Sequence, residues 1–124
     1  MRFARPAACF AALAILIFSA VELHAAGALA TGKCGAFGYA FDDLSPEAAA
    51  LRARAQCKGQ NCKVVTSFRR ACAAFAVDAT NACGPHAWAH APTLGRAQNI
   101  ASEACHRYGG RNCMVRAWVC DAKG

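Results

Sequence analysis

The sequence lacks the short motifs that mark common enzyme sites. It contains no Gly-x-Ser-x-Gly elbow, no glycine-rich nucleotide loop and no His-Glu-x-x-His zinc motif, so nothing in it indicates the enzymes that use them. The nearest approach to an acid–base cluster is Asp42, Asp43 and Glu47, but these residues precede a predicted helix, where acidic side chains offset the helix dipole. We therefore predict that the protein is not an enzyme and needs no cofactor.

Acidic residues are scarce, since seven Asp and Glu stand against fourteen Lys and Arg, for a net charge of +7. The basic residues are scattered along the chain, and arginines late in each predicted helix complement its negative end. The excess positive charge also suits an acidic partner, such as an anionic glycan, an anionic lipid or an acidic protein. An aromatic–basic platform for nucleic acid is missing, so we expect no nucleic-acid binding.

No apolar run reaches the roughly 20 residues that a membrane-spanning helix needs. The run at 7–21 follows a short basic start and precedes small residues around Ala25 and Ala26. This layout is typical of a signal peptide. We predict that residues 1–25 are removed and that residues 26–124 are exported, to the periplasm or the exterior, with no transmembrane segment. Loss of Arg2, Arg5 and Glu22 would leave a net charge of +6.

Cysteine, by contrast, is abundant. Eight cysteines follow the predicted leader: Cys34, Cys57, Cys62, Cys72, Cys83, Cys105, Cys113 and Cys120. An even number in a short exported chain predicts a disulfide framework. The Cys-x4-Cys and Cys-x7-Cys spacings, with histidines nearby, are compatible with zinc. An oxidising compartment favours disulfides, and we predict no metal site.

The cysteines belong to a longer internal repeat. The segment 83–90 lies forty-nine residues after 34–41, and cysteine, glycine, an aromatic residue and alanine fall in the same places. Each copy continues through an alanine-rich stretch to three further cysteines. Self-similarity of this kind predicts a duplicated structural unit. We expect one domain at 26–124, with repeat 1 at about 27–72 and repeat 2 at about 73–121.

Each copy has the pattern strand, strand, helix, strand. Ser45 and Thr93 are suited to cap the two helices, and we expect the apolar stripe of the first helix at Ala48, Leu51 and Ala55. The predicted strands are 27–31, 36–42, 63–68, 73–78, 85–90 and 114–119. The fold class is therefore α+β: two helices packed on antiparallel sheet, with the copies sharing one sheet or one core.

Eight cysteines allow 105 pairings, and sequence alone does not choose among them. The repeat favours Cys57–Cys62 and Cys105–Cys113 as local bridges, and Cys72–Cys120 and Cys34–Cys83 as equivalent positions that meet about a pseudo-twofold axis. A bridged Cys105 is no nucleophile, so we assign no thiol–imidazole pair to it and His106.

Several polar and aromatic residues are candidates for a binding surface. His86, Trp88 and His90 lie on one face of a predicted strand, and two histidines four residues apart are about 13 Å from each other, too far to share a metal easily. The candidate binding surface comprises Tyr39, Arg69, Arg70, His86, Trp88 and His90.

The order of motifs resembles a bacterial family, domain of unknown function 4189. The resemblance rests on an alanine-rich helix followed by Cys105-x3-Gly-Gly-x2-Cys113 and Val-Arg-x-Trp-x-Cys120. The first copy is similar but has a shorter cysteine loop without the double glycine. The resemblance implies a small exported protein without defining catalytic residues. Some relatives resemble antitoxin-type partners, or cargo, of secretion systems.

We therefore expect a non-enzymatic, disulfide-stabilised binding protein of the bacterial envelope. The expected partner is another protein, with a toxin or effector that it neutralises as one hypothesis. The alternative is a cationic module that binds anionic envelope polymers or lipids.

Overall fold

The computed structural model describes residues 25–121, so residues 1–24 of the predicted leader lie outside the described residues. Its elements are β1 (Ala26–Thr31), the short 3-10 turn η1 (Lys33–Gly35), β2 (Phe37–Asp43), α1 (Pro46–Gln56), β3 (Lys63–Phe68), β4 (Cys72–Asp78), β5 (His86–Ala91), α2 (Leu94–Arg107) and β6 (Cys113–Cys120). Every predicted strand forms within one residue of its expected bounds. Within residues 25–121, no helix has the length and apolar character needed to cross a bilayer.

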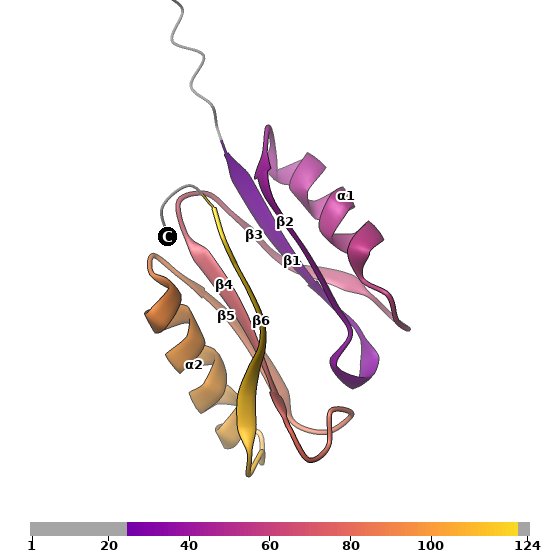
Figure 1. Cartoon of the computed structure of the whole chain (residues 1–124), viewed down its shortest axis with the longest axis vertical. Helices are drawn as coiled ribbons and strands as arrows, with labels where there is room; N and C mark the ends of the chain where they lie inside the picture. Colours follow the sequence, from indigo (N-terminus) through magenta and orange to yellow (C-terminus); the bar gives the residue numbers. More distant parts are fainter. Residues whose placement is uncertain (1–24, 122–124) are drawn as a thin grey trace, which may run out of the picture.

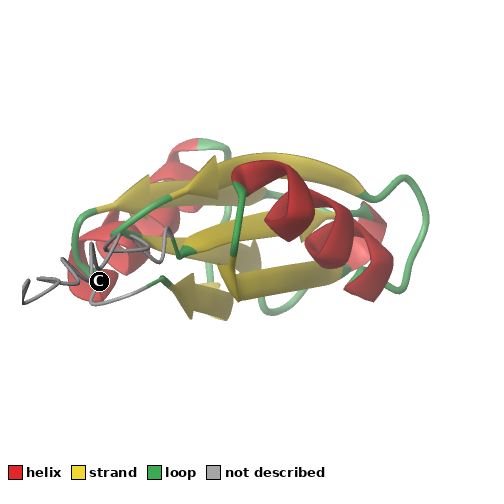
Figure 2. Ribbon diagram, turned by 90° about the horizontal axis from the view of Figure 1, so that it is seen from above, coloured by secondary structure: helices red, strands yellow, loops and turns green. Residues whose placement is uncertain are grey.

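The two copies fold into two antiparallel sheets of three strands each. The strand orders are β2-β1-β3 and β5-β4-β6, so the first strand of each copy lies in the middle. Helix α1 covers the outer face of the first sheet and α2 that of the second (Figure 1). Figure 2 shows the helices on opposite sides of the strands. The α+β prediction is confirmed, and the copies share a core rather than a sheet.

The core has three layers: one under each helix and one between the two sheets. Along β4, Ala74 and Ala76 face α2, whereas Phe75 and Val77 face the other sheet. Strand β1 alternates in the same way, with Ala28 and its alanine neighbours toward α1 and Leu29 toward the second sheet. The large buried side chains therefore lie between the sheets, together with a few alanines, and those under the helices are almost all alanine or cysteine.

The predicted apolar stripe of α1 is wrong. Ala49 and Ala53 are the buried residues of this helix, and Leu51 is 73% exposed. The sheet beneath α1 presents Gly38 and alanines, so only the smallest side chains fit where the helix and sheet approach closely.

Gly38 is the closest point between β2 and α1. An added Cβ atom would overlap the carbonyl oxygen of Ala53 and lie 2.5 Å from the backbone nitrogen of Cys57. We expect Gly38→Ala to lower the free energy of unfolding by about 2 kcal/mol, because the helix must move outward. Chemical denaturation would measure this loss.

The second helix offers a matched control for that substitution. A Cβ atom added at Gly95 would meet nothing within 4 Å, so we expect Gly95→Ala to be neutral or stabilising by about 0.5 kcal/mol. Equal denaturation midpoints for Gly38→Ala and wild type would contradict the packing described for α1.

Four disulfides connect the eight cysteines at 34–120: Cys34–Cys83, Cys57–Cys62, Cys72–Cys120 and Cys105–Cys113. These are the pairs that the repeat favours, but the reasoning for one of them is wrong. Cys72 and Cys120 are not equivalent residues of two copies, because they are register partners on neighbouring strands β4 and β6 of the second sheet. Only Cys34–Cys83 therefore joins the two units.

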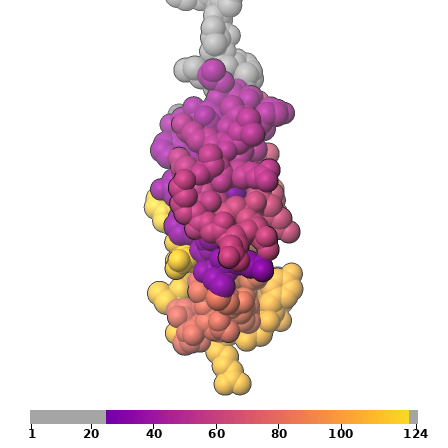
Figure 3. Space-filling model, turned by 90° about the vertical axis from the view of Figure 1, so that its right-hand side faces the viewer, coloured from indigo at the N-terminus to yellow at the C-terminus, as the bar shows by residue number. Residues whose placement is uncertain are grey.

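A buried carboxylate also joins the units, at Asp121. The side chain is completely buried and accepts hydrogen bonds from the backbone N–H groups of Asp42 and Arg70, both at 3.3 Å. Asp42 is the penultimate residue of β2, and Arg70 lies in the turn before β4. In Figure 3, seen from the side of α1, the first unit covers most of the surface and the second emerges below it.

Candidate functional site

The two sheets meet at two related edges. Strand β2 of the first sheet contacts β6 of the second, and β3 of the first contacts β5 of the second. A pseudo-twofold rotation that interchanges the two copies also interchanges these two edges. The disulfide between the equivalent residues Cys34 and Cys83 fits such an axis. Tyr39 on β2 and Trp88 on β5 therefore lie at opposite edges, and the structure does not bring the predicted binding residues together on one surface.

The first edge is open, and we name it the β2/β6 groove. Its volume is about 520 Å³, within the usual range for ligand pockets. Tyr39 and Phe41, which share one face of β2, are 37% and 46% exposed, so the groove contains exposed aromatic surface. The groove is lined by Phe37, Tyr39, Phe41, Arg116, Ala117, Trp118, Val119 and Cys120.

One wall of the groove is an aromatic row, and one end is cationic. The rings of Phe37 and Tyr39 are nearly parallel, with 7° between their planes and 6.4 Å between their centroids. The Nε of Arg116 donates a hydrogen bond of 2.6 Å to the carbonyl of Gly35. Its guanidinium carbon lies 5.8 Å from the centre of the Phe37 ring. These contacts fix Arg116 beside the aromatic row.

The opposite edge, between β3 and β5, is occupied by its own side chains. The ring of His90 stacks against Phe68 at 6.4 Å between centroids, and its Nδ1 is 3.2 Å from the hydroxyl of Thr66. His86 packs edge-on against Phe75. His90 therefore connects the two sheets at this edge, His86 packs within its own sheet, and Trp88 is 41% exposed. These three residues are the counterparts of Phe41, Phe37 and Tyr39.

Two residue differences explain why one edge is open and the other is occupied. The strand registers make Ala117 the counterpart of Thr66, and Val119 the counterpart of Phe68. In each case the second copy has the smaller side chain. The space that Thr66 and Phe68 fill at the β3/β5 edge is therefore left free beside Phe41.

The register partners of Phe68 and Val119 on the middle strands β1 and β4 explain why Phe68 is the larger of the two. An added Cβ atom at Gly27 would lie 2.7 Å from the ring of Phe68, so this ring fits only because Gly27 lacks one. The register partner of Val119 is Ala73, whose methyl group takes that space. A smaller side chain is therefore required at Val119.

Arg116 occupies a β-bulge. The register of β6 shifts between Val115 and Ala117, and that of β3 shifts between Val64 and Thr66. The extra residue is Arg116 in the second copy and Val65 in the first. Bulges re-aim a side chain: Val65 packs against the core between the sheets, whereas Arg116 is exposed at the groove.

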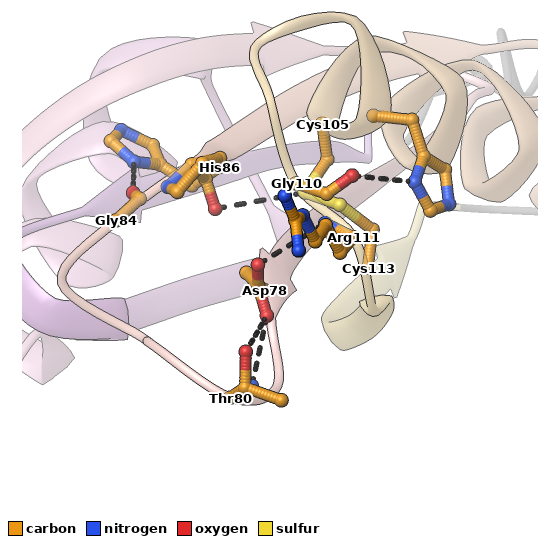
Figure 4. Close-up of a disulfide and its surroundings, with 10 residues drawn as sticks. Asp78, Thr80, Gly84, His86, Cys105, Gly110, Arg111 and Cys113 are labelled. Carbon is orange, nitrogen blue, oxygen red and sulfur yellow. Dashed lines mark hydrogen bonds between the residues drawn. A yellow bond between two sulfur atoms is a disulfide. The ribbon is translucent and has the colours of Figure 1, made fainter.

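A second cluster of polar residues lies at the far end of the second unit (Figure 4). Asp78 accepts hydrogen bonds from the hydroxyl of Thr80 at 2.6 Å and from the backbone N–H of Arg111 at 3.2 Å. The hydrogen bond from the Thr80 hydroxyl has the largest effect, followed by those from the backbone N–H groups of Thr80 and Arg111. Together they hold the pKa of Asp78 below its usual value. The carboxylate thus joins two loops, and its surroundings are those of a structural group.

The histidines and cysteines around Asp78 are also engaged in structural contacts. The Nδ1 of His86 is 2.9 Å from the carbonyl of Gly84, and that of His106 is 2.9 Å from the carbonyl of Gly110. The sulfur of Cys105 bonds to Cys113. Because every cysteine at 34–120 is bridged, none offers a free thiolate to zinc or to a substrate.

The remaining candidate residues lie elsewhere. Asp43 pairs with Arg52 at 3.1 Å, and Arg69 and Arg70 are exposed in the turn before β4. Among residues 25–121, no three His, Cys, Asp or Glu side chains are grouped closely enough to hold a metal ion.

Sequence reasoning identified one residue of the groove, Tyr39, and missed its neighbours. The signal for two of them was present, because Phe37, Tyr39 and Phe41 alternate along a predicted strand and must share a face. The pairing of β2 with the edge of another sheet, which adds Arg116 and Trp118, has no local signature in the sequence.

Comparison with known proteins identifies a family for this chain. Residues 26–120 match the family described as Domain of unknown function (DUF4189). No curated protein and no solved structure shows a significant match. The match spans nearly all of the described residues and confirms the resemblance noted in the sequence. The chain therefore belongs to the DUF4189 family.

Proposed function

We propose that the protein is an exported, non-enzymatic binding protein of the bacterial envelope, and that it recognises another protein through the β2/β6 groove. The observation that carries this proposal is the difference between two equivalent edges of a duplicated fold. One edge is occupied by Thr66, Phe68 and His90. The other has an open groove with an aromatic row.

The composition of the groove favours binding over catalysis. Its lining is aromatic and aliphatic with one fixed cation, Arg116. Aromatic residues and arginine dominate the energetic centres of protein interfaces. Four disulfides suit an oxidising compartment, where a rigid scaffold keeps such a surface preorganised.

Tyr39→Ala is expected to weaken partner binding by about 2 kcal/mol, roughly 30-fold, because it removes the centre of the aromatic row. Trp88→Ala is the matched control, since Trp88 occupies the equivalent position on β5 and is similarly exposed, at 41% against 37%. Affinity capture from envelope extract with wild type and both variants measures the effect. Recovery of the same protein by wild type and Tyr39→Ala in equal amounts would refute a role for the groove.

The excess positive charge of the chain supports a second candidate, a cationic module for anionic envelope polymers or lipids. Arg69 and Arg70 are exposed and adjacent, and such binding is electrostatic. Retention on an anionic glycan or on anionic vesicles should then fall steeply as salt rises. Retention that is unaffected by salt would eliminate this candidate.

A further inference from the structure

We propose that the partner enters the β2/β6 groove as an extended peptide segment that pairs with the free edge of β2. This inference rests on the proposed binding function and specifies its chemistry. The segment places a large apolar side chain over the aromatic row and a carboxylate side chain on Arg116.

Strand β2 is an edge strand among the described residues, because it pairs with β1 alone. Half of the backbone N–H and C=O groups of an edge strand point away from its neighbour and are able to pair with another chain. Addition of a peptide strand to such an edge is a common mode of recognition, in which the main chain gives affinity and alternate side chains give specificity.

The two ends of β2 are already engaged, which limits the length of the peptide. At its end, the carbonyl of Phe41 accepts a hydrogen bond of 2.7 Å from Arg52, and the backbone N–H of Asp42 donates to Asp121. Before its start, the carbonyl of Gly35 accepts from Arg116. The segment 37–40 remains for pairing, so the paired part of the peptide is about four residues long.

The side chains beside this edge define what the peptide must carry. Phe37 and Tyr39 face the groove side of β2, whereas Gly38 and Ala40 face α1. Alternate side chains of an added strand therefore lie over the aromatic rings. An apolar residue there removes its own surface and that of the exposed Tyr39 from water.

Arg116 supplies the charge preference. Its Nε bond to Gly35 holds the guanidinium in place, and no carboxylate at 25–121 pairs with it within 4 Å. A carboxylate binds the two terminal nitrogens of a guanidinium in a bidentate manner. The expected peptide has an acidic residue two positions from the apolar one, since residues two apart share a face of a strand.

Phage-displayed random heptapeptides, selected on the oxidised protein, provide the test. We expect enriched sequences with an aromatic or large aliphatic residue and an acidic residue two positions apart. Binding of a synthetic copy should fall at least tenfold with Tyr39→Ala and should be unchanged with Trp88→Ala. Arg116→Val, which introduces the residue found at the equivalent bulge, should abolish the preference for the acidic residue.

N-methylation of successive peptide amides separates strand pairing from other modes of binding. Pairing predicts a tenfold or greater loss at every second amide and little change at the amides between. Uniform tolerance of N-methylation would overturn strand pairing and leave groove binding intact. Peptides unaffected by Tyr39→Ala, or an empty selection, would overturn both.

Two other occupants have distinct signatures in the same assays. Binding of phosphatidylglycerol vesicles that depends on Tyr39, with no enriched peptide, would replace the peptide by an anionic lipid. A concentration-dependent dimer in sedimentation that Tyr39→Ala dissociates would replace it by a second copy of the chain. Either result overturns the proposal.

Discussion

Reduction of all four disulfides is expected to unfold the protein at room temperature. The bridges Cys34–Cys83 and Cys72–Cys120 close sequence separations of 49 and 48 residues. On the loop-entropy model each contributes about 4 kcal/mol, and each short bridge contributes about 2 kcal/mol. A domain of this size is typically stable by only 5–15 kcal/mol. Circular dichroism with and without a phosphine reductant would show the loss of structure.

Removal of one short bridge is the control for that experiment. Cys57→Ser with Cys62→Ser opens a loop with a sequence separation of 5, so we expect a loss of about 2 kcal/mol and a folded protein. A fully reduced protein that unfolds with the same midpoint as the oxidised one would show that the alanine-rich layers alone stabilise the fold.

Asp121→Ala is expected to lower the free energy of unfolding by about 3 kcal/mol. The substitution leaves the backbone N–H groups of Asp42 and Arg70 without their carboxylate acceptor, and a hydrogen bond to a charged group contributes about 1.5–3 kcal/mol. Because Asp42 and Arg70 have left-handed backbones, with φ of 57° and 51°, these bonds also hold two conformations that non-glycine residues seldom adopt. Urea denaturation would measure the loss.

Asp121→Asn separates the hydrogen bonds from the volume of the side chain. Asparagine keeps one acceptor oxygen, so the expected loss is about half that of Asp121→Ala. Identical stability of wild type and Asp121→Ala would show that the hydrogen bonds of Asp121 to Asp42 and Arg70 do not stabilise the fold.

Much of the fold could be predicted because the duplication provides the sequence with an internal alignment. The alternation at 63–68 and 114–119, and the capping residues Ser45 and Thr93, defined elements that the structure contains. The buried stripe of α1 could not be predicted from the size of the side chains on the helix. Its buried face is set by the glycine and alanines of the sheet, so Leu51 points to solvent and Ala53 is buried.

The candidate site was less predictable, for a physical reason. Its residues come from the edges of two sheets that do not share hydrogen bonds, and the packing of sheet on sheet decides which edges meet. The candidate binding surface predicted from the sequence contains both Tyr39 and Trp88, yet they lie at opposite edges. The contrast between Val119 and Phe68 becomes visible only when the strand registers are compared.

The two copies thus differ in a way that assigns stability to one edge and the proposed binding to the other. At one edge Phe68, Thr66 and His90 connect the sheets. At the other, smaller residues and Arg116 leave aromatic surface available. A rigid scaffold with one open edge is able to bind a partner without rearranging, which limits the entropy cost of association.

The most direct test of this account compares the backbone amide signals of the two equivalent edge strands, β2 and β5. A proton–nitrogen correlation spectrum is recorded while the selected peptide is added to the oxidised protein. The account predicts that the amide signals of 37–41 shift, and that the indole N–H signal of Trp88 and the amide signals of 86–90 stay in place. Shifts at Trp88 and the amides of 86–90, with the amides of 37–41 unmoved, would contradict it.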